Sequence, residues 1–169
     1  MNTAEILADA FGRVRENVHG AVRGLPAAAL NLRVDDDANS IAWLVWHLTR
    51  VQDDHVADVA GREQVWTSGG WHDRFGLALP AGDTGYGHTS AQVGAVRVDD
   101  PELLAGYHDA VYEQTRSYLR GLTDADLDHV VDEHWDPPVT LGVRLVSVVN
   151  DDMEHAGQAA YVRGIAQRR

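Results

Sequence analysis

A carboxylate and an imidazole stand four residues apart in NDDMEHAGQAAYVRG, residues 150–164, a segment with the pattern of a helix. They are Asp151 and His155, and Gln158 follows about one turn later. At about 100° per residue, the three side chains fall within roughly one third of the helix circumference. The same face carries the apolar residues Val148, Ala159 and Val162. A core-facing stripe with these polar groups predicts metal-ligand or acid/base chemistry.

A third candidate ligand, His47, lies in the apolar stretch SIAWLVWHLTRVQDDH. A lone helical histidine beside tryptophan is more often a satisfied core group than a ligand. If this helix faces the C-terminal one, however, His47 can meet Asp151 and His155. Two imidazoles and a carboxylate are a common ligand set for catalytic zinc or another divalent metal, with positions left open for water or substrate.

Four long helical segments of alternating direction must position these residues, which predicts an all-α four-helix bundle. Ser40 is a candidate N-cap and Gly61 a candidate stop for the second helix, and Asp100 with Pro101 opens the third. Shorter helical turns are expected after Thr89 and Thr123. The long segments run from Thr3 to Leu25, from Ser40 to Gly61, from Asp100 to Leu122, and from Gly142 to Arg168.

The connection between the second and third long helices, residues 62–99, is rich in Gly, Trp and Thr. Because a connection this long in a compact domain is usually functional or disordered, its aromatic residues favour a long ordered loop. Tyr86 and His88 are flanked by glycine and either line the site or form an exposed turn. Asp54 either orients His47 or belongs to a solvated helix flank, and Gln158 is expected to bond a ligand carboxylate.

Composition bounds the remaining possibilities. The 169 residues, 44% of them hydrophobic, fit one domain spanning 1–169. A net charge of -12 argues against nucleic acid or an anionic membrane as partner. There is no cysteine and no apolar run long enough for a membrane span, so we expect a cytoplasmic protein whose thiol chemistry uses an imported thiol.

Four arginines could bind carboxylates, although salt bridges to the 26 acidic residues are their more frequent use: Arg50, Arg116, Arg144 and Arg163.

The two ligand-bearing stretches, with GREQVW and GDTGYGHTSAQV between them, resemble the DinB superfamily of metal-binding four-helix bundles over roughly residues 40–164. The likeness is to its actinobacterial, mycothiol-dependent branch, which includes the metal-binding domain of maleylpyruvate isomerase. Carried onto this chain, the resemblance implies that His47, Asp151 and His155 hold a divalent cation, with Gly157 and Gln158 completing the pattern. Many members have histidine at the place of Asp151 and the isomerase branch has glutamate, so this shorter carboxylate binds either directly or through water.

The resemblance implies an enzyme: a metal-dependent thiol transferase or isomerase in which a metal-activated thiolate, from mycothiol or a similar small thiol, attacks an electrophilic small molecule. Zinc is the first expectation for the metal, with nickel, manganese and iron as alternatives. Two other functions remain open, a non-catalytic metal-binding stress-response protein of the same fold and a metal-dependent hydrolase. We also expect a homodimer, with Trp66 and Trp71 as exposed residues able to close its interface.

Overall fold

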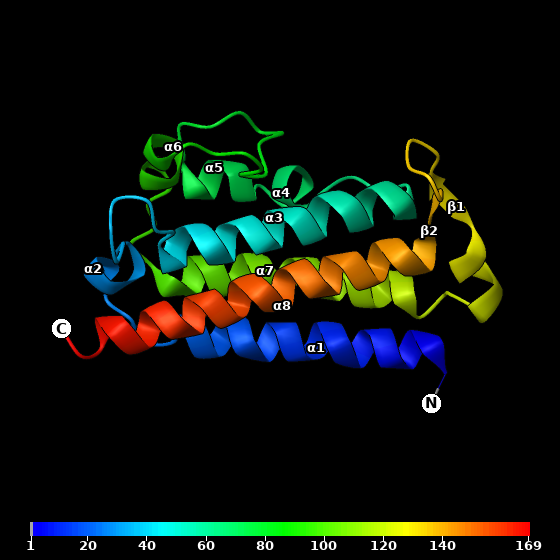
Figure 1. Ribbon diagram of the computed structural model, residues 1–169, viewed down its shortest axis with the longest axis horizontal. Helices are drawn as coiled ribbons and strands as arrows, with labels where there is room; N and C mark the ends of the chain where they lie inside the picture. The colour runs from blue at the N-terminus through cyan, green and yellow to red at the C-terminus, as the bar shows by residue number, and fades with distance from the viewer. Residues whose placement is uncertain (1) are drawn as a thin grey trace.

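Four long helices frame the molecule, and the computed structural model, which describes residues 2–169, confirms the predicted all-α bundle (Figure 1). Two short strands, Val130–Asp132 (β1) and Val139–Thr140 (β2), form an antiparallel hairpin that the sequence did not predict. The long helices are Thr3–Val22 (α1), Ile41–Ala60 (α3), Pro101–Leu119 (α7) and Leu141–Ala166 (α8).

The helix that carries His47 begins and ends where its sequence predicts. Ser40 caps α3 by accepting a hydrogen bond from the Trp43 backbone N–H, and Gly61 ends it in the left-handed conformation at φ 60°. Asp100 accepts from the Glu102 N–H at the start of α7, directly before Pro101. These caps satisfy backbone groups that a helix end leaves unpaired, and the Ser40 cap thereby fixes where the helix that bears His47 begins.

The expected alternation of helix direction is wrong for α7, which runs parallel to α3 (Figure 1). Arg50 contacts Tyr107 in the middle part of α3, and the Tyr118 hydroxyl donates to the Val59 carbonyl near the end of both helices. The reason is the connection between them, residues 61–100, which returns the chain along the bundle before α7 starts. The other long helices, α1 and α8, run in the opposite direction (Figure 1).

The long connection is ordered, as expected, and contains three short helices: Val65–Ser68 (α4), Trp71–Phe75 (α5) and Ser90–Ala95 (α6). Only α6, capped by Thr89, was expected. Trp66 is only 2% exposed and packs against Trp46, while Trp71 is half-buried on Tyr107. The expectation that these two tryptophans are exposed for a dimer interface is therefore wrong, because they anchor the connection to the bundle.

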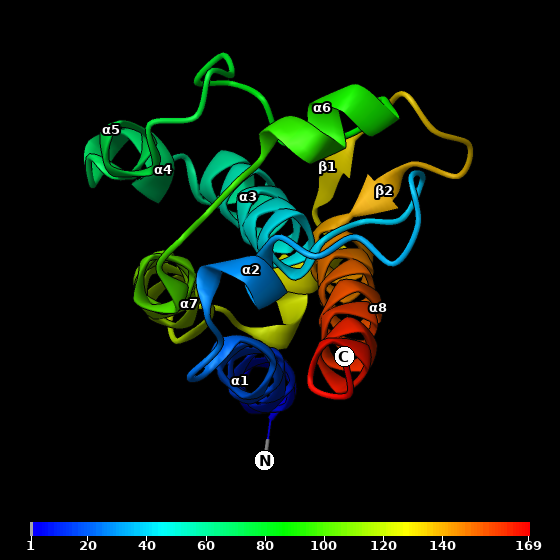
Figure 2. The ribbon, with the colours of Figure 1, turned by 90° about the vertical axis from the view of Figure 1, so that its left-hand side faces the viewer.

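Two further short elements complete the chain. Ala27–Leu30 (α2) was not predicted, whereas the 3-10 turn Asp124–Asp128 (η1) carries the expected capping box on Thr123. Seen along the bundle, α3 lies between α7 and α8 and beneath the connection (Figure 2). Residues 40–50 of the chain are accordingly buried without interruption. Within residues 2–169, no helix has both the length and the apolar character that crossing a membrane requires.

Candidate metal centre

The three predicted ligands converge between α3 and α8, which run antiparallel at this point. One ligand atom from each of His47, Asp151 and His155 lies within 4.8 Å of the other two. The two imidazole rings are 4.9 Å apart, and His155 Nε2 is 3.7 Å from Asp151 Oδ1. Within residues 2–169 this is the one cluster of three such side chains close enough to share a cation.

The ring of His47 is held with one nitrogen facing the cluster. Its Nδ1 donates to the Thr84 backbone carbonyl at 2.5 Å, and the ring stacks on Trp43 with centroids 4.5 Å apart. Burial is the main cause that lowers the pKa of His47 below its ordinary value. A neutral imidazole with its Nδ1 proton committed presents the lone pair of Nε2, which is the form that binds a metal.

His155 is oriented in the same way by its own helix. Its Nδ1 lies 3.0 Å from Gln158 Oε1, an acceptor three residues further along α8. Gln158 was expected to bond the carboxylate of Asp151, and this expectation is wrong, because its side-chain amide bonds the imidazole of His155. The consequence is again a free Nε2, because Nδ1 carries the proton.

The carboxylate of Asp151 supplies a test of whether these residues fit a metal. Its Oδ2 is buried and has no hydrogen-bond partner, although buried carboxylate oxygens are nearly always paired. One nitrogen of each imidazole and one oxygen of this carboxylate lie within 4.8 Å of one another in the cluster. A divalent cation would satisfy all three, so the donor set fits zinc or a similar metal.

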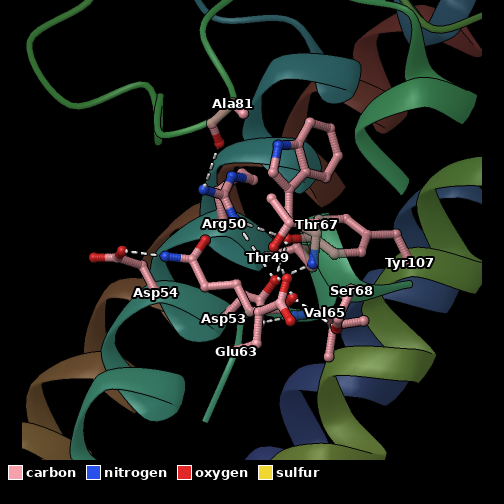
Figure 3. A network of polar contacts seen from close by, with 12 residues as sticks. Thr49, Arg50, Asp53, Asp54, Glu63, Val65, Thr67, Ser68, Ala81 and Tyr107 are labelled. Atoms are coloured by element: carbon pink, nitrogen blue, oxygen red, sulfur yellow. Dashed lines mark hydrogen bonds and ion pairs between the residues drawn. The ribbon is translucent and has the colours of Figure 1, made fainter. Parts of the chain in front are cut away.

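The loop that carries Thr84 is fixed to α3 by a buried polar network (Figure 3). The Arg50 guanidinium, fully buried, donates to the carbonyls of Ala81 at 3.4 Å and Asp83 at 3.1 Å. The Asp53 carboxylate lies 3.6 Å from Arg50 and accepts the backbone N–H groups of residues 65 and 66, at the start of α4. Burial raises the pKa of Asp53, against the hydrogen bonds and the cation that oppose it.

Gly85 and His88 complete the support of His47. Gly85 has a φ of 89°, and a Cβ there would lie 2.8 Å from His47 Nδ1, so only glycine allows the loop to approach the ring. His88 donates from Nε2 to Asp83 at 3.0 Å and accepts at Nδ1 from the Trp43 indole N–H at 3.1 Å. With its side chain only 3% exposed, His88 supports the loop from behind the site instead of lining the cavity.

A cavity of about 450 Å³ opens beside the ligands. Asp54 and Tyr86 both lie in its wall, and the Tyr86 side chain is almost fully exposed. The prediction that Asp54 orients His47 is wrong, because the Nδ1 of that ring donates to Thr84 and Asp54 accepts from Gln64. The wall also contains side chains that the sequence did not assign to the site. Arg144 could have been assigned from its spacing, because it lies two helical turns before Asp151. The lining residues are His47, Val51, Asp54, His55, Thr84, Tyr86, Trp135, Arg144, Ser147, Val148 and Asp151.

Comparison with known proteins agrees with this architecture. A crystal structure of a conserved protein from Enterococcus faecalis matches with a TM-score of 0.93 and 30% sequence identity, covering 100% of this chain and 99% of that chain. No curated protein matches the sequence. The family model of the DinB superfamily matches residues 10–159, which include all three candidate ligands. The chain therefore belongs to the DinB superfamily.

Proposed function

We propose that the protein is a divalent-metal-dependent thiol transferase, with mycothiol or a similar small thiol as co-substrate and an electrophilic small molecule as acceptor. One observation carries the proposal. The side chains of His47, Asp151 and His155 bring one ligand atom each within 4.8 Å of one another beside a cavity of about 450 Å³, which is large enough for small-molecule ligands, and Asp151 Oδ2 is buried without a hydrogen-bond partner. Three protein ligands leave at least one position for a co-substrate, as catalytic sites require.

A divalent cation held by these residues would lower the pKa of a bound thiol and so supply a thiolate near neutral pH. The thiol proton would pass to solvent, the sulfur would form a bond to the electrophilic carbon, and the leaving group would depart with the bonding electron pair. Thr84 and Gln158 hold the two imidazoles in the required tautomer, and Trp43 packs against the face of His47. The protein contributes no cysteine, so the nucleophilic sulfur has to come from the co-substrate.

The choice of mycothiol rests on the resemblance of the ligand-bearing stretches to the mycothiol-dependent branch of the superfamily. Zinc is our first choice of metal, because two imidazoles and one carboxylate are among its common ligand sets, with nickel, manganese or iron as alternatives. A cytoplasmic location fits the proposal, since small thiols are kept reduced there.

The proposal is tested by incubating zinc-loaded protein with mycothiol and monochlorobimane, a fluorogenic electrophile, and measuring conjugate formation. We expect a rate well above the uncatalysed one, and we expect His155→Ala to lose both the bound metal and this rate. Equal conjugation by metal-free and metal-loaded protein would contradict a metal-dependent transferase.

The same samples separate the alternatives. A metal-dependent hydrolase or isomerase would turn over a test ester or a cis-enone without thiol consumption. A non-catalytic metal-binding protein would lose thermal stability on metal removal, while neither thiol nor electrophile bound to it.

We also propose a homodimer, whose interface is formed by another surface than Trp66 and Trp71. Val146, Met153 and Tyr161 are exposed on α8, spaced so that they share its outer side. We expect sedimentation velocity to show a dimer that Met153→Asp dissociates. A wild-type protein that sediments as a monomer at all concentrations would contradict the homodimer.

A further inference from the structure

We propose that Arg144 and His55 form a carboxylate-binding subsite in the cavity, so that its ligand carries a carboxylate at one end and reaches the metal ligands with the other. This inference deepens the proposed function and rests on it. It names the class of small molecule that the site selects.

Arg144 is held in place and still available to a ligand. One terminal nitrogen, Nη2, donates to Asp132 Oδ2 at 3.0 Å, and the other, Nη1, lies 3.3 Å from His55 Nδ1. The guanidinium has more N–H groups than these two contacts use, and the side chain lines the cavity. A guanidinium already oriented by a carboxylate loses little freedom when it binds a second one.

His55 adds a second donor beside it. Because an arginine can only donate, Nδ1 of His55 must accept, and its proton is on Nε2. Burial, followed by the charge of Arg144, lowers the pKa of His55, in agreement with a neutral ring. His55 lines the same cavity as Arg144, so a carboxylate there can receive hydrogen bonds from both side chains.

The spacing along the helices defines the length of the ligand. Arg144 lies seven residues before Asp151 on the same side of α8, which is about 10 Å along the axis. His55 lies eight residues after His47 on α3, a separation of roughly 12 Å. Val51 and Val148 line the same cavity, so the middle of the ligand is expected to be apolar.

The remaining candidate arginines are committed elsewhere. None of the three lines the cavity. Arg50 is buried against loop carbonyls and Asp53, Arg116 lies on the surface 3.6 Å from Glu113, and Arg163 donates to carbonyls at the end of α1. Arg144 is thus the one of these four cations that a cavity ligand can reach.

Asp54 provides an opposing charge in the same wall. Its Oδ1 accepts from Gln64 Nε2 at 2.7 Å, but the side chain carries no cationic partner among its hydrogen bonds within residues 2–169. A bound carboxylate would be repelled by Asp54 and attracted by Arg144. The two residues therefore predict opposite effects on an anionic ligand, which makes them matched test positions.

The experiment uses cobalt-substituted protein and two series of thiols of increasing length, ω-mercaptocarboxylic acids and the corresponding ω-mercaptoalcohols. Binding is followed by the thiolate-to-cobalt absorption band. We expect acids of about 10 Å to bind at least about tenfold more tightly than their alcohols, with no such preference for the shortest acids. Arg144→Gln should abolish the preference, because it weakens the binding of the acids more than that of the alcohols, and Asp54→Asn should enlarge it.

Equal affinities of acids and alcohols at every length, or a preference that persists in Arg144→Gln, would overturn the subsite. Asp54→Asn decides the case if Arg144→Gln does not fold, since an unaltered preference there also counts against it. If neither series changes the cobalt spectrum, the thiol function fails, which is a separate result. The subsite is then decided by calorimetry with alkyl carboxylates: binding absent from the matched alkyl alcohols supports it, and no binding overturns it.

Discussion

Each candidate imidazole ligand is directed by a hydrogen bond at its Nδ1 atom. For His47 the acceptor is a backbone carbonyl of a distant loop, and for His155 it is a side chain one turn along the same helix. Outer partners of this kind fix the ring orientation and raise the basicity of the coordinating nitrogen. The affinity of the centre should thus depend on residues that never touch the metal.

Replacing Gln158 tests this dependence. Gln158→Leu removes the acceptor for His155 Nδ1 at similar size, so we expect zinc affinity to fall by roughly 10- to 100-fold. Gln158→Glu keeps an acceptor oxygen and should bind zinc at least as tightly as the wild type. Competition with a fluorescent chelator measures both. An affinity of Gln158→Leu equal to that of the wild type would show that the contact does not orient the ligand.

Loop 81–88 is the element that completes the centre from outside the bundle. It is tied to α3 through the donors of Arg50, and Gly85 packs directly on His47. The loop and α3 therefore behave as one unit, in which a displacement of the loop moves the Thr84 carbonyl away from His47 Nδ1.

Two glycines in this loop allow the effect of displacing the Thr84 carbonyl on zinc affinity to be told apart from the effect of backbone strain. Gly85→Ala would place a methyl group 2.8 Å from His47 Nδ1, whereas a methyl group at Gly87 meets no atom within 4 Å, and both have positive φ. We expect Gly85→Ala to weaken zinc binding by roughly tenfold or more, beyond any loss in Gly87→Ala, because only the former displaces the carbonyl. Similar zinc affinities in the two variants would argue against the loop's role.

The helices of the bundle and the pairing of Asp151 with His155 as candidate ligands could be predicted from the sequence because their signals are local, whereas adding His47 depended on the resemblance to a known family. Caps such as Ser40 and Asp100, and the spacing of Asp151 and His155, act within one or two turns of helix. The direction of α7 could not be predicted, since it depends on the path of the whole connection. Nor could the partner of His47: Thr84 lies 37 residues away, and only the folded loop brings its carbonyl to the ring.

At the scale of the whole molecule, a buried histidine makes the free energy of unfolding depend on pH. His108 is fully buried in α7, with Nδ1 3.2 Å from Thr49 Oγ1 and Nε2 unpartnered among the described residues. The Thr49 hydroxyl donates to the Val45 carbonyl, so His108 Nδ1 is the donor to Thr49. Burial lowers the pKa of His108 to about 3.

This pKa sets the sign of the pH effect. The unfolded chain takes up a proton at this histidine below about pH 6.5 while the folded protein does not, so stability is complete above that pH and is lost as the pH falls toward 3. For metal-free protein, we expect His108 to remove about 2 kcal/mol of unfolding free energy between pH 6.5 and pH 5.

Urea unfolding at several pH values measures this loss, with His108→Gln as the control. The amide can still donate to Thr49 but does not titrate, so the variant should lose less stability over the same pH range. Identical pH slopes for the two proteins would mean that His108 does not contribute. Burial also lowers the pKa values of His47 and His55, and these groups act in the same direction in both proteins.

The central claim is that His47, Asp151 and His155 hold a divalent metal, and elemental analysis of the purified, tag-free protein tests it most directly. Plasma mass spectrometry should find close to one equivalent of zinc or another divalent metal in the wild type. His47→Ala and His155→Ala should each lose it, while His129→Ala, which removes an exposed histidine that is not part of the cluster, should retain it. A wild type that stays metal-free after incubation with zinc, nickel, manganese and iron(II) would contradict the account, as would metal that persists in both ligand variants.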